Sequence, residues 1–142
     1  MDRIPRLRIL LFPPANRGFR GKRWLGIALR TAHLVGTAGA GAHFLYGAPA
    51  AAWLPYLWLT LASGLVMTAL EIWSNGFWLI QLRGVAVLAK LGLLGVAMHA
   101  PAYAAPALVF IVVISGVVSH APARVRYWSV LHRRRVDALP AP

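Results

Sequence analysis

The chain of 142 residues is 59% hydrophobic and only 13% charged, which is too apolar for an ordinary water-soluble domain of this length. Its formal charge is +12, from 15 lysines and arginines against three acidic residues, and most of the cations lie in segments 1–24 and 121–142. A nucleic-acid-binding domain would carry such charge on a folded polar surface. Here the charge flanks an apolar middle, so we expect a membrane as the partner and no nucleic acid. The absence of cysteine excludes disulfides, iron–sulfur clusters and cysteine nucleophiles.

Residues 1–23 are interpreted as a basic arm. The apolar run 9–12 has only four residues and is followed by Pro13 and Pro14, so it is too short for the core of a cleavable signal peptide. We therefore expect this arm to lie on the cytoplasmic surface of the membrane.

Four hydrophobic stretches follow the arm and predict an all-α integral membrane protein, a bundle of four transmembrane helices over residues 24–120. The first three have 23, 23 and 24 residues, enough to cross a hydrocarbon core of about 30 Å at about 1.5 Å per residue. The fourth has 17 residues and ends before Pro122, which disfavours helical geometry at the preceding residue. The predicted spans are 24–46, 51–73, 76–99 and 104–120.

The distribution of lysine and arginine predicts the orientation. Loops 47–50 and 100–103 carry no charge, whereas both end segments are rich in arginine. The positive-inside rule then predicts a multi-pass protein of the inner membrane with both termini in the cytoplasm. Within the tail 121–142, segment 124–135 mixes five arginines with apolar residues, which is typical of an interfacial helix among anionic lipid head groups.

Histidine is the most informative residue type for function. Four of the five histidines lie in predicted spans, where ionisable side chains are costly and usually have a role or a partner. Depths counted from the cytoplasmic ends predict that His33 meets His120 and that His43 meets His99. Each histidine shares its helix face with small residues, and these include Gly36, Gly92, Gly95 and Gly116.

Histidines that face each other across a helical bundle predict axial ligation of b-type haem, with glycines giving the macrocycle room. Arg30 precedes His33 by three residues and so can meet a haem propionate. In its predicted architecture the chain is similar to the four-helix cytochrome b membrane subunits, which carry electrons between quinone and a partner enzyme. The ten-residue spacing of His33 and His43 is shorter than in those subunits, so one haem or two both remain open.

The expected function is therefore electron transfer by a small haem-bearing membrane protein or subunit, with quinone as a candidate electron partner. The alternative is a cofactor-free accessory or assembly subunit whose histidines are structural. A small transporter is a third alternative. No hydrolase, kinase or P-loop motif is present, so any enzymatic activity would belong to an oxidoreductase subunit.

The charged residues inside the spans complete the predictions. Glu71 is the only acid between the end segments, and we expect it to pair with Arg30 or Arg83. Arg83 and Lys90 share a face opposite to His99, so they would point out of the bundle if the histidines point in. That orientation predicts another membrane subunit or a second copy of the chain beside Arg83 and Lys90.

Overall fold

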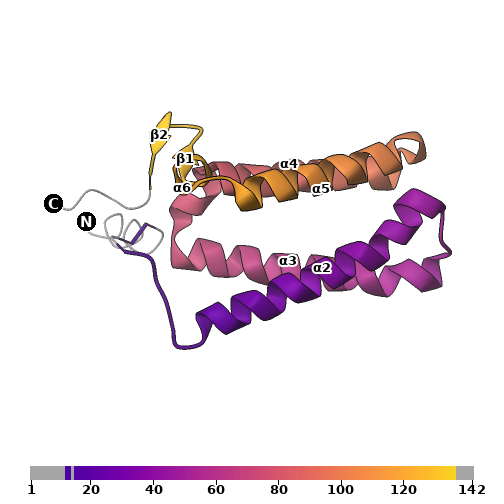
Figure 1. The fold of residues 1–142 in the computed structure, drawn as a ribbon, viewed down its shortest axis with the longest axis horizontal. Helices are drawn as coiled ribbons and strands as arrows, with labels where there is room; N and C mark the ends of the chain where they lie inside the picture. Colours follow the sequence, from indigo (N-terminus) through magenta and orange to yellow (C-terminus); the bar gives the residue numbers. More distant parts are fainter. Residues whose placement is uncertain (1–11, 14, 137–142) are drawn as a thin grey trace, which may run out of the picture.

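The computed structural model describes residues 12–13 and 15–136, and its main elements are four long helices. Helix α2 packs against α3, and α4 packs against α5, so the chain forms two antiparallel helical hairpins (Figure 1). The part of the predicted basic arm over residues 1–11 lies outside the described residues. The helices are α2 (Lys22–Tyr46), α3 (Ala50–Ser74), α4 (Leu82–His99) and α5 (Ala104–His120).

Three helical segments of the described chain are long and apolar enough to cross a membrane, namely Ala50–Ser74, Leu82–His99 and Pro101–His120. Only 11–17% of the residues in their most apolar windows are buried inside the protein. Large apolar surfaces of this kind mark contact with lipid or with another protein. The predicted all-α fold is confirmed at this level, with three helices that are candidate membrane spans. Helix α2 is as long as α3 but contains Arg30 and two histidines, and it is not one of the three.

Glycines allow α2 and α3 to approach closely. A Cβ atom built at Gly36 would lie 2.7 Å from the backbone nitrogen of Thr60, and one built at Gly39 would overlap the ring of Tyr56. Small residues at such crossings let helix backbones come into contact, as in many membrane helix pairs. The first hairpin is therefore held by direct backbone packing.

The two hairpins meet at the end of the molecule that carries the α2–α3 and α4–α5 connections, here called the loop end. A buried cluster of Phe44, Ala97, Ala107 and Leu108 joins them there. At the opposite tail end the hairpins separate (Figure 1) and are linked by a 3₁₀ helix, η1 (Gly76–Ile80).

The prediction of one continuous third span over 76–99 is wrong. The chain forms η1, becomes extended at Gln81, and only then begins α4. The physical reason is that polar side chains at both ends of η1 hydrogen-bond to backbone groups, one nearby and one far away in the chain. The Asn75 side chain accepts a hydrogen bond from the Phe77 amide at 3.0 Å, and the Gln81 side chain donates to the Val136 carbonyl at 2.6 Å.

The prediction of an interfacial helix over 124–135 is also wrong. Only α6 (Ala123–Arg126) is helical, and β1 (Trp128–Ser129) then pairs antiparallel with β2 (Arg134–Arg135). Ser129 explains the change, because it forms a β-bridge with Gln81 and its hydroxyl accepts the His132 amide at 3.2 Å. A short 3₁₀ helix, η2 (Pro101–Tyr103), completes the elements of the described residues.

Candidate functional site: a cleft between the two hairpins

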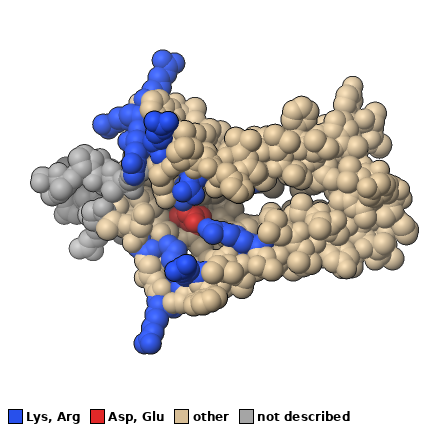
Figure 2. Space-filling model, viewed as in Figure 1, with Lys and Arg blue, Asp and Glu red and all other residues tan. Residues whose placement is uncertain are grey.

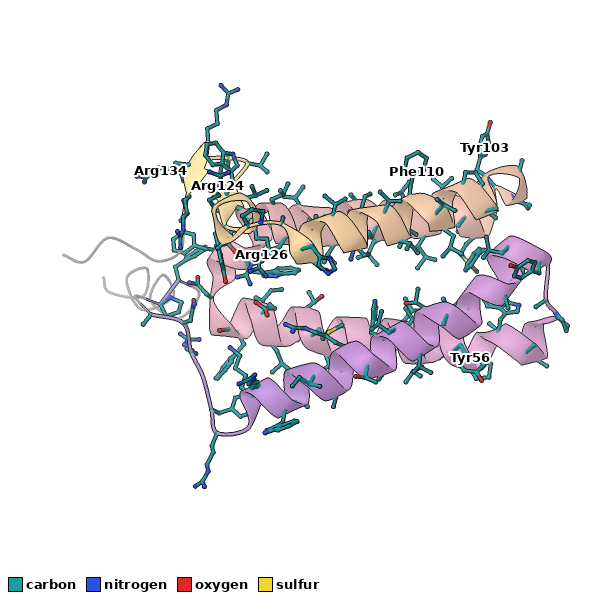
Figure 3. All side chains as sticks on the ribbon, viewed as in Figure 1. Tyr56, Tyr103, Phe110, Arg124, Arg126 and Arg134 are labelled. Carbon is teal, nitrogen blue, oxygen red and sulfur yellow. The ribbon has the colours of Figure 1, made fainter. Side chains whose placement is uncertain are left out.

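A hollow separates the two hairpins on the tail side of their contact (Figure 2). Its apex is marked by Gly41 of α2, where a built Cβ would lie 3.5 Å from Cδ2 of Leu108 on α5. We call this hollow the cleft. Tyr103 of η2 and Phe110 of α5 point away from it (Figure 3), and both are exposed. The outer surface is therefore apolar, whereas charged residues border the cleft.

A polar network closes the cleft at the tail end. Arg83 Nη1 donates to Glu71 Oε2 at 2.9 Å, and Arg83 Nε donates to Gln81 Oε1 at 2.7 Å. The guanidinium also lies over the Tyr127 ring, 4.8 Å from its centroid. The predicted pairing of Glu71 with Arg83 is confirmed. Arg83 does not point out of the bundle, because Glu71 of the other hairpin holds it.

Sequence reasoning missed most of this network. Gln81 and Ser129 are 1% and 0% exposed, and they are the largest fully buried side chains of the described residues. Buried polar side chains need hydrogen-bond partners, and here these come from segments far apart in the chain. One feature of the sequence could have indicated the network: the polar residues Ser74, Asn75 and Gln81 interrupt an otherwise apolar region.

His33 joins α2 to α3 beside the cleft. Its Nδ1 lies 2.9 Å from the Thr60 carbonyl oxygen and 3.2 Å from the Ser63 hydroxyl. Because a carbonyl oxygen only accepts, Nδ1 carries the hydrogen and Nε2 keeps its lone pair. The imidazole is therefore oriented by the neighbouring helix.

His99 and His120 are held by their own helices. In each ring Nδ1 donates to the carbonyl oxygen four residues earlier, that of Gly95 or Gly116, at 2.9 Å. Both side chains are exposed. In the neutral form of each ring, the same tautomer argument leaves the lone pair on Nε2.

His43 has a different environment at the loop end. Its ring stacks on Trp53, with centroids 4.2 Å apart and planes 15° apart, and its edge meets Phe44. Its Nδ1 is buried without a hydrogen-bond partner. The stacking fixes the ring inside the first hairpin.

The structure does not bring His43 and His99 together as the sequence predicted. Phe44, next to His43, and Ala97, two residues before His99, belong to the cluster that fills the space between the hairpins. A second haem at the loop end, which the sequence left open, stays a prediction.

His33 and His120 both lie on the tail side of the cleft apex. His33 is eight residues from Gly41, or about 12 Å along α2, and His120 is twelve residues from Leu108, or about 18 Å along α5. Their heights thus differ by only about 6 Å. Among the described residues no hydrogen bond or ring contact joins two histidines, and no group of three metal-ligand side chains occurs. Ligation by this pair stays a prediction.

The predicted cofactor-binding glycines divide into two kinds. Gly36 packs against α3, where a built Cβ would lie 2.7 Å from the Thr60 backbone nitrogen, so that side of Gly36 has no free space. Gly92, Gly95 and Gly116 have no atom within 4 Å of a built Cβ, so their surroundings are open.

Two cations near the cleft have no counter-ion. Arg30 is exposed and makes no hydrogen bond or ion pair with the described residues. Lys90 of α4 is half-buried and makes no hydrogen bond or ion pair with the described residues. The predicted partner subunit or second copy beside Lys90 stays a prediction.

The chain was compared with protein-family models, curated proteins and solved structures, and no match was found. The interpretation of the cleft therefore depends on the chemistry of its own residues. These residues supply two oriented imidazoles, two unpaired cations and open glycines, held between rigid hairpins.

Proposed function

We propose that the protein crosses the inner membrane four times with both termini in the cytoplasm. It binds a single b-type haem in the cleft through His33 and His120 and transfers electrons. The arginine-rich tail end supports the orientation, because Arg124 and Arg134 extend there (Figure 3) and cytoplasmic ends of membrane proteins are rich in such residues.

The observation that carries the proposal is the state of the two imidazoles. In His33 and His120, Nδ1 donates to a backbone carbonyl at 2.9 Å. Metal-ligating histidines usually make this second hydrogen bond, which fixes the tautomer and directs the lone pair of Nε2 to the metal. In their neutral form, both rings would thus offer Nε2 as a ligand from different hairpins.

The surroundings of the pair support a flat, apolar cofactor. Gly116, one turn from His120, has open space where a side chain would stand. The close packing of α2 on α3 holds His33 in place through Thr60 and Ser63. When bound, haem supplies one-electron redox chemistry whose potential depends on its axial ligands and on burial. The electron partner would be a quinone or another membrane subunit.

The test is an absorption spectrum of the detergent-purified protein, oxidised and dithionite-reduced, with a pyridine haemochrome assay to count haem per chain. We expect a Soret band that shifts on reduction and a single haem b per chain. A folded but colourless protein from cells with ample haem would contradict the proposal.

A second candidate function is a cofactor-free accessory subunit of a membrane complex. The stacking of His43 on Trp53 favours it, because this histidine has a purely structural environment. The bonds from His33 to α3 serve a structural role equally well. A colourless protein that co-purifies with another membrane subunit would support this candidate.

A further inference from the structure

A surface pocket lies at the tail end, where the C-terminal segment 121–136 meets the start of α4. Its walls are Leu82, the first residue of α4, and Arg124, Val125 and Trp128 of the C-terminal segment. The pocket has a volume of about 420 Å³, which lies within the usual range of about 300–1,000 Å³ for ligand sites. Three apolar side chains and one cation therefore surround the same space.

This pocket lies at the boundary of two candidate membrane spans. The span Leu82–His99 begins at its wall, and the span Pro101–His120 ends four residues before Arg124. Trp128 is 45% exposed, and tryptophan is enriched at membrane–water interfaces because its indole is apolar with one polar N–H group. The pocket is therefore at the level of the lipid head groups if both spans cross the bilayer.

The charge around the pocket is positive. Arg124 is exposed and makes no hydrogen bond or ion pair with the described residues. Next to Trp128 in the chain, the Tyr127 ring has three more guanidinium groups at 4.8–6.0 Å from its centroid, those of Arg83, Arg126 and Arg135. Glu71 is the only acid of the described residues, and it pairs with Arg83. Among the described residues no acid is thus left for Arg124.

We propose that this pocket binds one anionic phospholipid, with its phosphate at Arg124 and its apolar part against Leu82, Val125 and Trp128. Arginine binds phosphate through charge-assisted hydrogen bonds. The apolar walls favour a lipid over a soluble phosphate ester, because only a lipid brings apolar surface to bury there. The neighbouring arginines favour an anionic head group over a zwitterionic one, whose cation they would repel. This site requires the proposed crossing of the membrane but not the haem.

Native mass spectrometry of the full chain in a neutral detergent tests the head group. Phosphatidylglycerol and phosphatidylcholine with identical acyl chains are added in equal amounts, and the wild type should retain phosphatidylglycerol in preference. Arg124→Gln should lower that preference about tenfold, as expected for the loss of a charge-assisted hydrogen bond, and Arg124→Lys should keep most of it. The matched control is Arg134→Gln, which removes the same charge from an exposed position of the same segment that is not among the described residues lining the pocket. It should keep the preference.

Two further measurements test the apolar walls. Trp128→Ala should lower the retention of phosphatidylglycerol, whereas Trp128→Phe, which keeps an aromatic ring, should retain it. Glycerol 3-phosphate, which has a phosphate but no acyl chain, should not displace the lipid at equal concentration. Displacement would identify a soluble phosphate ester as the ligand and contradict the lipid site.

The comparison of the two arginine variants decides between a site and a diffuse attraction. Equal losses of preference in Arg124→Gln and Arg134→Gln would show that the tail end attracts anionic lipid only through its total charge, and would overturn the proposal. A wild type without any preference would overturn it as well. Haem content measured on the same preparations separates the two proposals, because a colourless protein that keeps the lipid preference contradicts the haem function and supports the lipid site.

Discussion

At the residue scale, the space around each glycine separates those that pack helices from those that face an open surface. The packing glycine and the open glycines all lie on apolar helices, on the same helix face as a histidine. The sequence therefore predicted the same role for all of them, beside a cofactor. Only the neighbouring helix decides between the roles, and the position of that helix is not encoded near the glycine. Gly36 meets the α3 backbone, whereas Gly116 meets nothing within 4 Å.

Gly36→Ala should therefore destabilise the protein by about 1–3 kcal/mol, because the new methyl group overlaps Thr60 and a backbone must move. Gly116→Ala is the matched control, since it adds the same methyl group into open space and should leave the melting temperature unchanged or slightly higher. Thermal unfolding of both variants in detergent, followed by circular dichroism, measures the difference. Equal melting temperatures would mean that α2 and α3 do not approach as closely as described.

The Glu71–Arg83 pair gives a second prediction at this scale. The two side chains come from different hairpins and are 34% and 22% exposed. A double-mutant cycle with Glu71→Gln and Arg83→Gln should give a favourable coupling of about 0.5–3 kcal/mol, the range measured for residues in contact. Chemical unfolding of the four proteins measures this coupling. A coupling of zero would show that the bridge across the tail end contributes nothing to stability.

At the scale of the elements, hydropathy predicted the helical segments well, and polar contacts between distant segments set their ends. The bounds predicted for the first, second and fourth spans lie within two residues of α2, α3 and α5. The third span was predicted six residues too early at its start, because Gln81 interrupts it through contacts with Val136 and Ser129. Residues 48 and 55 positions away in the chain cannot be inferred from local periodicity.

Gln81→Ala should release the C-terminal segment from the bundle. The substitution leaves the Val136 carbonyl without its donor and removes an acceptor from Arg83, and buried polar groups that lose a partner are destabilising. Trypsin should then cleave the segment Arg133–Arg135 faster than in the wild type. Leu131→Ala, at a position that is 73% exposed, is the control and should be cleaved at the wild-type rate. If both variants are cleaved equally, Gln81 does not anchor the segment.

At the scale of the whole molecule, the apolar exterior indicates a membrane, and the distribution of charge predicts how the chain lies in it. The chain contains no cysteine, so single cysteines report topology without background. Gly18→Cys and Leu131→Cys probe the tail end, and Pro49→Cys and Ala102→Cys probe the loop end; all four positions are exposed.

A membrane-impermeant maleimide should label the two loop-end cysteines in intact spheroplasts and the two tail-end cysteines only after permeabilisation. This result requires α2 to cross the membrane, although it is less apolar than the other three helices. Labelling of Gly18→Cys from outside, with Leu131→Cys protected, would show three crossings and place the N-terminal segment outside.

For the histidines, the sequence predicts positions along each helix but not the packing between the two hairpins. Helical rise counted from the contact between Gly41 and Leu108 puts the heights of His33 and His120 about 6 Å apart along the helix axes. The cluster around Phe44, which fills the space near His43 and His99, depends on how two hairpins pack. No pattern within a single helix reports that packing.

The central claim is that one haem lies between His33 and His120, and the haem content of four single variants tests it most directly. Pyridine haemochrome assays of purified His33→Ala, His120→Ala, His43→Ala and His99→Ala should show loss of haem in the first two and wild-type content in the last two. Wild-type content in His33→Ala and His120→Ala, or equal loss in all four folded variants, would contradict the claim.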